Sequence, residues 1–402
     1  MHRKMPFILL IEMIVLAFLT PFMPLLLQKL LFAVSLTIKS GIVFLLPFII
    51  FGLLFKTMVK LAKQATFIII FILLMVCTSN AMTTFLSHYV GMGVFQFNMT
   101  LLAPQSATGL LPLWTLNLPK LIANDKAMLA GIGLGIILGN FFPALSQSVA
   151  NKLDAIINKF LSLIIYVIPV FIAGFVVKLQ CDGAMVTLAK DYTKIFSIIA
   201  LSQFSYIFFL YFTANRFQFK DTIQSIKNML PAVMAGFSTM SSAAAMPFTI
   251  AGVKRNTQNK DFASSIIPVT VNIHLVGDCI AIPILAYAVM KSFGVHEPAL
   301  MTYLIFVCYF VLAKFSVAAI PGGGILVMLP ILETYLGFNA EMLSLITALY
   351  ILFDPVITSA NVLGNGAFAL LIDKLQGRRL VVREEGRDAP TLSSRKIFVN
   401  DI

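Results

Sequence analysis

A small set of ionisable and amide side chains lies inside long apolar stretches of this chain, and these residues have the clearest chemical potential. They occupy two stretches, residues 261–290 and 340–372. The residues concerned are His274 and Asp278 in the first stretch, and Asp354, Asn361 and Asn365 in the second. A charge at the centre of a membrane-spanning helix costs at least ~2.5 kcal/mol, so these side chains require a partner or an aqueous cavity. They indicate a site near mid-membrane that binds a small solute or a cation.

Catalytic chemistry has little support in the sequence. Ser241 and Ser242 are the nearest candidates for a nucleophile, but neither has a histidine base nearby in the chain. The four cysteines show no paired spacing, which favours buried small side chains over metal ligands or disulfides. We therefore predict that the chain is not an enzyme and uses no cofactor and no bound metal.

The elements that must position these residues are long apolar segments. Of the 402 residues, 59% are hydrophobic and 11% are charged, whereas a soluble domain averages about a quarter charged. A helix of roughly 20 apolar residues crosses a hydrocarbon core. We predict an all-α polytopic membrane protein with spans at residues 6–28, 34–57, 65–90, 127–146, 157–179, 193–214, 261–290 and 340–372.

The distribution of positive charge indicates the orientation of the chain. The net charge is +12, and Lys and Arg concentrate in short segments such as 216–227 and 378–396. The positive-inside rule places such segments in the cytoplasm, so we predict that both termini are cytoplasmic and that the charge serves no nucleic acid. We expect a multi-pass protein of a bacterial inner membrane, with residues 377–402 as a solvated cytoplasmic tail.

Two apolar segments in the second half are interrupted by small and helix-breaking residues. Residues 225–252 contain Pro231, Gly236 and Pro247, and residues 303–336 contain Pro321-Gly322-Gly323-Gly324. Broken segments at membrane depth are tolerated only where protein or an aqueous cavity lines them. A pair of them is the best sequence indication of a transporter's binding site, although closely packed small residues offer a purely structural explanation.

Three motifs in these segments resemble the glutamate transporter homologues, the dicarboxylate/amino acid:cation symporters. Ser238-Thr-Met-Ser-Ser-Ala-Ala-Ala-Met-Pro247 is similar to the serine-rich tip of that family's first hairpin. Ile320-Pro-Gly-Gly-Gly324 is similar to the V-P-G-A-G tip of the second hairpin. Asp354-Pro-Val-Ile-Thr-Ser-Ala-Asn361-Val-Leu-Gly-Asn365 is similar to D-x-x-R-T-x-x-N-V-x-G-D in the last span.

The resemblance implies an elevator fold with about eight transmembrane helices and two re-entrant helical hairpins. Residues 1–220 would be mainly scaffold and trimerisation spans, with the third and sixth spans contributing to the transport domain. Residues 221–376 would form the transport core, and 377–402 the tail. The resemblance further implies a homotrimer in the lipid bilayer that carries a small-molecule substrate together with a coupling cation.

The resemblance also implies a solute site. Its residues would be Ser241, Ser242, Pro321, Gly322, Gly324, Asp354, Thr358 and Asn361. The two hairpin tips would enclose the solute, Asp354 would pair with its amine and Asn361 would hydrogen-bond its carboxylate. Exposed N–H groups at hairpin tips suit the anionic end of a ligand on general grounds.

Two departures from the motifs concern the solute. The arginine that would hold an acidic side chain falls at Ile357, and its alternative position falls at Met240, so neither position has a cation. A second carboxylate would lie unpaired in a pocket of low dielectric constant, at a cost of several kcal/mol. We predict a symporter for a neutral amino acid. The alternatives are a sodium-coupled symporter for dicarboxylates or acidic amino acids, and a degenerate transporter that acts as an ion channel.

Further departures concern the coupled ion. The motif N-M-D-G-T becomes His274-Leu-Val-Gly277-Asp278, and the last aspartate of the final motif becomes Asn365. In a continuous helix His274 and Asp278 would lie one turn apart on one face. We predict that His274, Asp278, Asn361 and Asn365 take part in ion coupling, with a proton favoured over sodium because histidine titrates near neutral pH. A structural His274–Asp278 pair and rearranged sodium ligands remain as alternatives.

Overall fold

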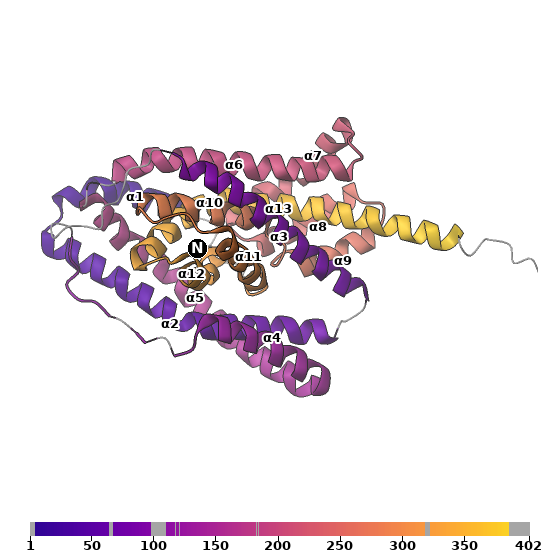
Figure 1. Ribbon diagram of the computed structural model, residues 1–402, viewed down its shortest axis with the longest axis horizontal. Coiled ribbons are helices and arrows are strands. Elements are labelled where there is room, and N and C mark those ends of the chain that lie inside the picture. Colours follow the sequence, from indigo (N-terminus) through magenta and orange to yellow (C-terminus); the bar gives the residue numbers. More distant parts are fainter. Residues whose placement is uncertain are drawn as a thin grey trace, which may run out of the picture.

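The computed structural model describes residues 5–63, 67–97, 110–116, 118–119, 121–181, 183, 185–317 and 322–385. Within these ranges the regular structure is helical throughout. Pro321, one of the predicted solute-site residues, lies outside the described residues. In Figure 1, α2 and α4 lie along the lower edge, α6 and α7 along the upper edge, and α10, α11 and α12 between them.

The first part of the chain forms a layer of long helices. Its elements are α1 (Met5–Leu19), the 3-10 turn η2 (Thr20–Phe22), α2 (Leu25–Lys63), α4 (Asn124–Phe141) and α5 (Pro143–Cys181). α2 packs along both α4 and α5. The approach of α4 to α2 is close because Gly131 and Gly135 face the backbone of Phe51 and Phe55, where a Cβ would lie 2.7 and 2.9 Å from the two carbonyl oxygens.

The predicted span 6–28 is wrong at its C-terminal end. α1 ends at Leu19, and η2 with Pro21 and the following Pro24 separates it from α2. Proline lacks the backbone N–H and clashes with the preceding helical turn, so two prolines three residues apart end the helix. Apolar content alone does not detect this, because the residues on both sides of the turn are equally hydrophobic.

The second part of the chain surrounds one deeply buried helix. α10 (Val276–Ser292) is buried along nearly its whole length and packs against α3 (Phe67–Phe95), α6 (Met185–Ala214) and α13 (Ala340–Glu385). A helix that is apolar on all faces and enclosed on all sides forms the centre of a bundle. α10 therefore holds the residues of its first turn, among them Asp278, in a fixed position.

The two broken segments form helical hairpins, as predicted. Hairpin 1 consists of α7 (Phe219–Thr239) and α8 (Ser242–Asn256), which pack against each other. Met240 joins them in the left-handed conformation, with φ 48°. Hairpin 2 consists of α11 (Leu300–Lys314) and α12 (Gly323–Leu336), with Gly322 at φ 72° directly before α12. Glycine adopts this conformation without a steric penalty, which explains its place at the turn.

The predicted continuous span 261–290 is wrong, because the helix is interrupted. α9 (Lys260–Thr270) ends five residues before α10 begins at Val276. The interruption holds Asn272 and His274, so the two halves do not form one continuous helical face. Pro268 near the end of α9 favours the break.

The last helix is longer than predicted. We expected a span at 340–372 and a tail from residue 377, whereas α13 runs from Ala340 to Glu385. Residues 386–402 lie outside the described residues.

Four of the described helical stretches are long and apolar enough to cross a membrane by themselves. They are Leu25–Lys60, Ile70–Phe95, Lys190–Ala214 and Glu341–Leu375. Their number and length identify a multi-pass membrane protein. Shorter apolar helices, including α11 and α12 of hairpin 2, pack among them.

Candidate solute and cation site

Asp354 on α13 holds the beginning of α12. One carboxylate oxygen accepts a hydrogen bond of 2.8 Å from the backbone N–H of Gly322, and the other accepts one of 2.8 Å from the hydroxyl of Thr358. Asp354 and Thr358 are both buried. Three residues predicted for the solute site are thus in direct contact, and hairpin 2 is attached to α13 through the carboxylate predicted to receive the solute amine.

Asp278, in the first turn of α10, is the most heavily bonded carboxylate of the site. Its Oδ2 lies 2.9 Å from Nζ of Lys314. Its Oδ1 accepts hydrogen bonds from the hydroxyl of Tyr350 at 2.9 Å and from the side-chain amide of Asn361 at 3.0 Å. The backbone N–H of Asp278 in turn donates to Oδ1 of Asn361 at 3.3 Å. Asn361 is therefore engaged with Asp278 through both its amide nitrogen and its amide oxygen, and its predicted contact with the solute carboxylate stays a prediction.

Lys314 is the cation of this site, and we did not predict it. Its side chain is 0% exposed and that of Asp278 is 1% exposed. The ammonium also lies 4.5 Å from the ring centroid of Phe310, one turn earlier on α11. A buried charge is tolerated when it is paired. Here the ring of Phe310 contacts the ammonium, and Tyr350 and Asn361 donate hydrogen bonds to the carboxylate. Lys314 is the only Asp, Glu, Lys or Arg between Glu297 and Glu333, so an isolated charge in an apolar segment was the signal that could have indicated it.

Close backbone contacts fix the position of Asp278. A Cβ at Gly324, in the first turn of α12, would overlap the hydroxyl of Tyr350 and the carboxylate of Asp278. A Cβ at Gly277 would overlap the carbonyl oxygen of Ile357 on α13. Glycine at both positions lets hairpin 2 and α13 approach the first turn of α10 directly.

His274 does not form the predicted pair with Asp278. It precedes α10, and its Nε2 lies 2.9 Å from the hydroxyl of Ser79 on α3. Its ring packs against Phe368, with 4.2 Å between the ring centroids. Nδ1 of His274 is buried and makes no hydrogen bond to any residue that the structure describes. The alternative that His274 and Asp278 form a structural pair is therefore wrong. The break at 271–275 turns the two side chains toward different partners.

Side-chain amides from three other helices support the interrupted backbone. Asn80 on α3 donates to the carbonyl of Ile273 at 2.7 Å and accepts from the N–H of Leu275 at 3.3 Å. Gln203 on α6 donates to the carbonyl of Gly277 at 2.9 Å, and Asn365 on α13 donates to the carbonyl of His274 at 3.0 Å. The bonds of Asn80 and Asn365 supply partners for backbone groups in the interruption, and that of Gln203 adds a contact to the first turn of α10. Asn80 and Gln203 were not predicted, although each is the one side-chain amide of its apolar helix, a signal that could have indicated both.

Three buried amide oxygens near this break make no hydrogen bond among the described residues. They belong to Gln203, Asn272 and Asn365. Buried acceptors of this kind call for a donor, a water molecule or a cation. Of the predicted ion-coupling residues, Asn365 thus offers a neutral oxygen, whereas both oxygens of Asp278 already have partners.

Hairpin 1 also packs against α13 near its turn. Gly236 on α7 lies against α13, where a Cβ would be 3.4 Å from the carbonyl oxygen of Thr358. Ser241 caps α8 by accepting a hydrogen bond from the N–H of Ala244 at 3.3 Å, and Ser242 is buried in the first turn. Met240 is also buried, so an apolar side chain occupies one of the two positions where the resemblance places a cation.

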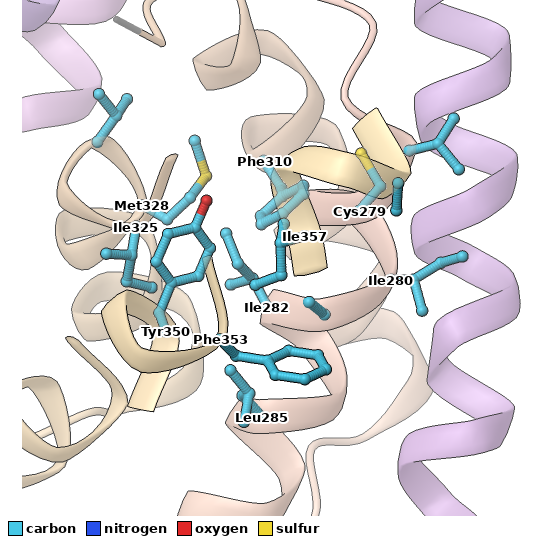
Figure 2. Packing of buried hydrophobic residues seen from close by; sticks show 14 of the residues in the cluster. Cys279, Ile280, Ile282, Leu285, Phe310, Ile325, Met328, Tyr350, Phe353 and Ile357 are labelled. Carbon is cyan, nitrogen blue, oxygen red and sulfur yellow. The ribbon is translucent and has the colours of Figure 1, made fainter. Parts of the chain in front are cut away.

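The other such position, Ile357, is fully buried among apolar side chains. Figure 2 shows Ile357 with Phe310, Ile282 and Tyr350 in the cluster between the central helices. No described cation other than Lys314 is bonded within this group of site residues, and Lys314 is committed to Asp278. The site therefore has one carboxylate, Asp354, whose charge no basic side chain balances.

One face of α13 carries much of this arrangement. The contributing residues are Tyr350, Asp354, Thr358, Asn361 and Asn365. They follow one another at intervals of four, four, three and four positions, the spacing that keeps side chains on one side of a helix. Tyr350 and Asn361 contact Asp278, Asp354 and Thr358 hold Gly322, and Asn365 supports the break before α10.

Interrupted helices whose broken ends converge on polar side chains define a class of protein, the secondary transporters. Comparison with known sequences names the family. A sequence model of the sodium:dicarboxylate symporter family matches residues 7–375, and the chain belongs to this family. This confirms the resemblance seen in the motifs. The family is one of symporters, and the relatives named below are transporters.

The matching relatives differ in what their names say they carry. The chain is 25% identical over 315 residues to mouse excitatory amino acid transporter 4, a region covering 74% of this chain and 52% of the relative. It is 26% identical over 272 residues to a serine/threonine transporter of Acinetobacter baylyi, covering 63% of this chain and 65% of the relative. It is 25% identical over 153 residues to a proton/sodium-glutamate symport protein of Geobacillus stearothermophilus, covering 38% and 36%. The matched region spans about half the length of the mouse transporter.

Proposed function

We propose that this chain is a secondary active symporter for a small solute with one amine and one carboxylate, a neutral amino acid. The observation that carries the proposal is the buried carboxylate of Asp354, which has no basic partner among the described residues, beside the buried apolar side chains of Ile357 and Met240. An ammonium group on the solute balances the charge of Asp354. A second carboxylate on the solute would find no cation, because Lys314 is already paired.

The solute carboxylate would be received by N–H groups at the hairpin tips. Gly322 precedes α12 and Ser241 precedes α8, so each tip presents the positive end of a helix. The serine/threonine transporter among the relatives gives this choice of solute a precedent. The glutamate transporters give the alternative, an acidic solute, an equal precedent by name.

We further propose that the coupled cation is a proton. Asp278, the carboxylate nearest to Asn361, is occupied by three donors, and Val276 and Asn365 stand where the motifs have aspartates. His274 remains as a buried titratable group with one free ring nitrogen among the described contacts. The alternative, sodium, would have to use the amide oxygens of Gln203, Asn272 and Asn365.

We also propose the location and the oligomeric state of the protein. The basic segments support cytoplasmic termini, and we propose a bacterial inner membrane as the location. α4 leaves Leu129, Ile136 and Ile137 exposed on the side away from α2, an apolar face that supports contact with lipid or with further copies in a homotrimer.

Thermal unfolding of the purified chain with single added solutes tests the proposal. A ligand that binds only the folded state raises its stability. We expect neutral amino acids to raise the melting temperature and succinate, glutamate and aspartate to leave it unchanged. Stabilisation by the acidic solutes alone would reverse the assignment made from Ile357 and Met240. Solute-independent current in liposomes, without counterflow of labelled solute, would point to a channel instead.

A further inference from the structure

We propose that the ammonium of Lys314 is a tethered cation, which permanently fills the cation position beside Asp278 and keeps metal cations away from this carboxylate. The inference rests on the proposed function only in treating this region as the cation site of a transporter. It holds for any solute.

The first support is the completeness of the coordination around Asp278. Lys314 is 2.9 Å from Oδ2, while Tyr350 and Asn361 donate to Oδ1 at 2.9 and 3.0 Å. A metal cation needs lone pairs of oxygen, but each of these three groups turns a hydrogen toward the carboxylate. An incoming sodium ion would meet the positive ends of two neutral donors and the charge of the ammonium.

The second support is the balance of charge. Lys314 and Asp278 are both fully enclosed, and together they are neutral. A buried carboxylate is stabilised by a positive partner, which can be an exchangeable ion or a side chain. Lys314 is a positive partner of this kind, and its ammonium is covalently attached to the chain. Asp278 therefore needs no ion from solution.

The third support is the place of Lys314 in the fold. It is the last residue of α11, directly before the tip of hairpin 2, where a cation also faces the negative end of the helix. Gly324, on the other side of the tip, lies against the same carboxylate. The ion pair therefore joins α11 to α10, and Gly324 brings α12 against the same carboxylate, next to the Asp354–Gly322 contact. An ion that left with each transport cycle would release both arms, whereas the tethered ammonium keeps them attached.

A merely structural ion pair would predict the same geometry but a different response to cations. The full chain is compared with Lys314→Ala, which leaves space and an unpaired carboxylate, and with the neutral double variant Asp278→Asn/Lys314→Met. Melting temperatures are measured in sodium chloride, in methylammonium chloride and in N-methylglucamine chloride at equal ionic strength.

We expect the wild type to show no saturable response to sodium. Lys314→Ala should melt at a lower temperature in N-methylglucamine, and sodium or methylammonium should restore several degrees in a saturable manner. The double variant should respond no more than the wild type, because position 278 then carries no charge to neutralise. A Lys314→Ala protein that responds no more than the double variant would overturn the proposal.

The wild-type titration decides the question if Lys314→Ala does not fold in any salt. Saturable stabilisation of the wild type by sodium, lost in the double variant, would mean that Asp278 binds sodium beside Lys314 and would overturn the proposal. No such stabilisation supports it. The solute screen is separate, so failure of neutral amino acids to bind would sink the proposed function and leave this result standing.

Discussion

The backbone N–H of Gly322 and the carboxylate of Asp354 are joined by a hydrogen bond of 2.8 Å, which links the second hairpin to the last helix. The same carboxylate is the proposed partner of the solute amine. A solute that binds Asp354 must therefore share this group with the hairpin or displace the hairpin from it. Solute binding and the position of hairpin 2 are coupled through one side chain.

Replacement of Asp354 by Asn tests this role. The amide keeps the size of the side chain but loses the charge that pairs with an ammonium group, a loss worth about 2–5 kcal/mol and so roughly 30-fold or more in affinity. Solute-induced stabilisation should disappear, and it is measured by thermal unfolding. Ser359→Ala is the matched control, since the bonds of its hydroxyl among the described residues go to the backbone carbonyls of Pro355 and Val233. Unchanged solute affinity in Asp354→Asn would remove this residue from the site.

Replacement of Ile357 by Arg should change the solute preference. Its guanidinium would supply a second cation, one that is not already paired as Lys314 is and that pairs well with a solute carboxylate. We expect glutamate or aspartate to stabilise the variant by a shift that the wild type does not show, with a weaker response to neutral amino acids. Ile357→Leu, which keeps the site neutral, should retain the wild-type preference. The same solute panel in a thermal shift assay measures both variants.

Replacement of Gly324 by Ala should be strongly unfavourable. The added Cβ would overlap Tyr350 and Asp278, and overpacking of this kind costs typically about 1–3 kcal/mol. We expect a clearly lower melting temperature. Gly133→Ala on α4 is the control, because a Cβ there meets nothing within 4 Å and alanine favours the helix by up to ~1 kcal/mol. Equal melting temperatures for the two variants would contradict the close contact at Gly324.

Replacement of Asn80 by Leu should destabilise the interrupted span. The carbonyl of Ile273 and the N–H of Leu275 would both lose their partner, at a cost of about 1–3 kcal/mol for each buried group. Thr78→Val on the same helix removes an exposed hydroxyl that bonds to its own helix and should change stability little. Chemical or thermal unfolding of both variants measures the difference. A mild effect at Asn80 would show that other groups can support the break.

Replacement of His274 by Gln tests the proposed proton coupling. Glutamine retains hydrogen-bonding capacity but does not titrate, so uptake driven by a pH gradient should fall at least about tenfold while counterflow of labelled solute continues. Ser79→Ala removes the hydroxyl partner and keeps the imidazole, so it should retain pH-driven uptake. Full pH-driven uptake by His274→Gln in proteoliposomes would exclude this histidine as the proton carrier.

Local signals in the sequence explain what could be predicted. Both hairpins were predictable because Pro321 to Gly324 and the small residues around Ser241 break apolar segments that are otherwise helical. The polar residues of the last span were predictable because carboxylates and amides are costly in a membrane. Each of these features is visible within a few residues of chain.

Features that depend on distant partners could not be predicted. Asn80 and Asn365 bond to the backbone of the break before α10, and Gln203 bonds to the first turn of α10, so its support comes from three other helices. The choice of Lys314 rather than His274 as partner of Asp278 depends on how hairpin 2 packs against α10. No spacing along the chain contains that information.

The single face of α13 that carries Tyr350, Asp354, Thr358, Asn361 and Asn365 limits how this protein can change over generations. Insertion or deletion of one residue between Tyr350 and Asn365 would turn everything beyond it by about 100° around the helix axis. The contact with Gly322, the hydrogen bonds to Asp278 and the support of the break before α10 would then be disrupted together. Descendants of this chain can acquire a new solute by exchanging side chains along that face. The number of residues between Tyr350 and Asn365 cannot change, because every contact along the face depends on it.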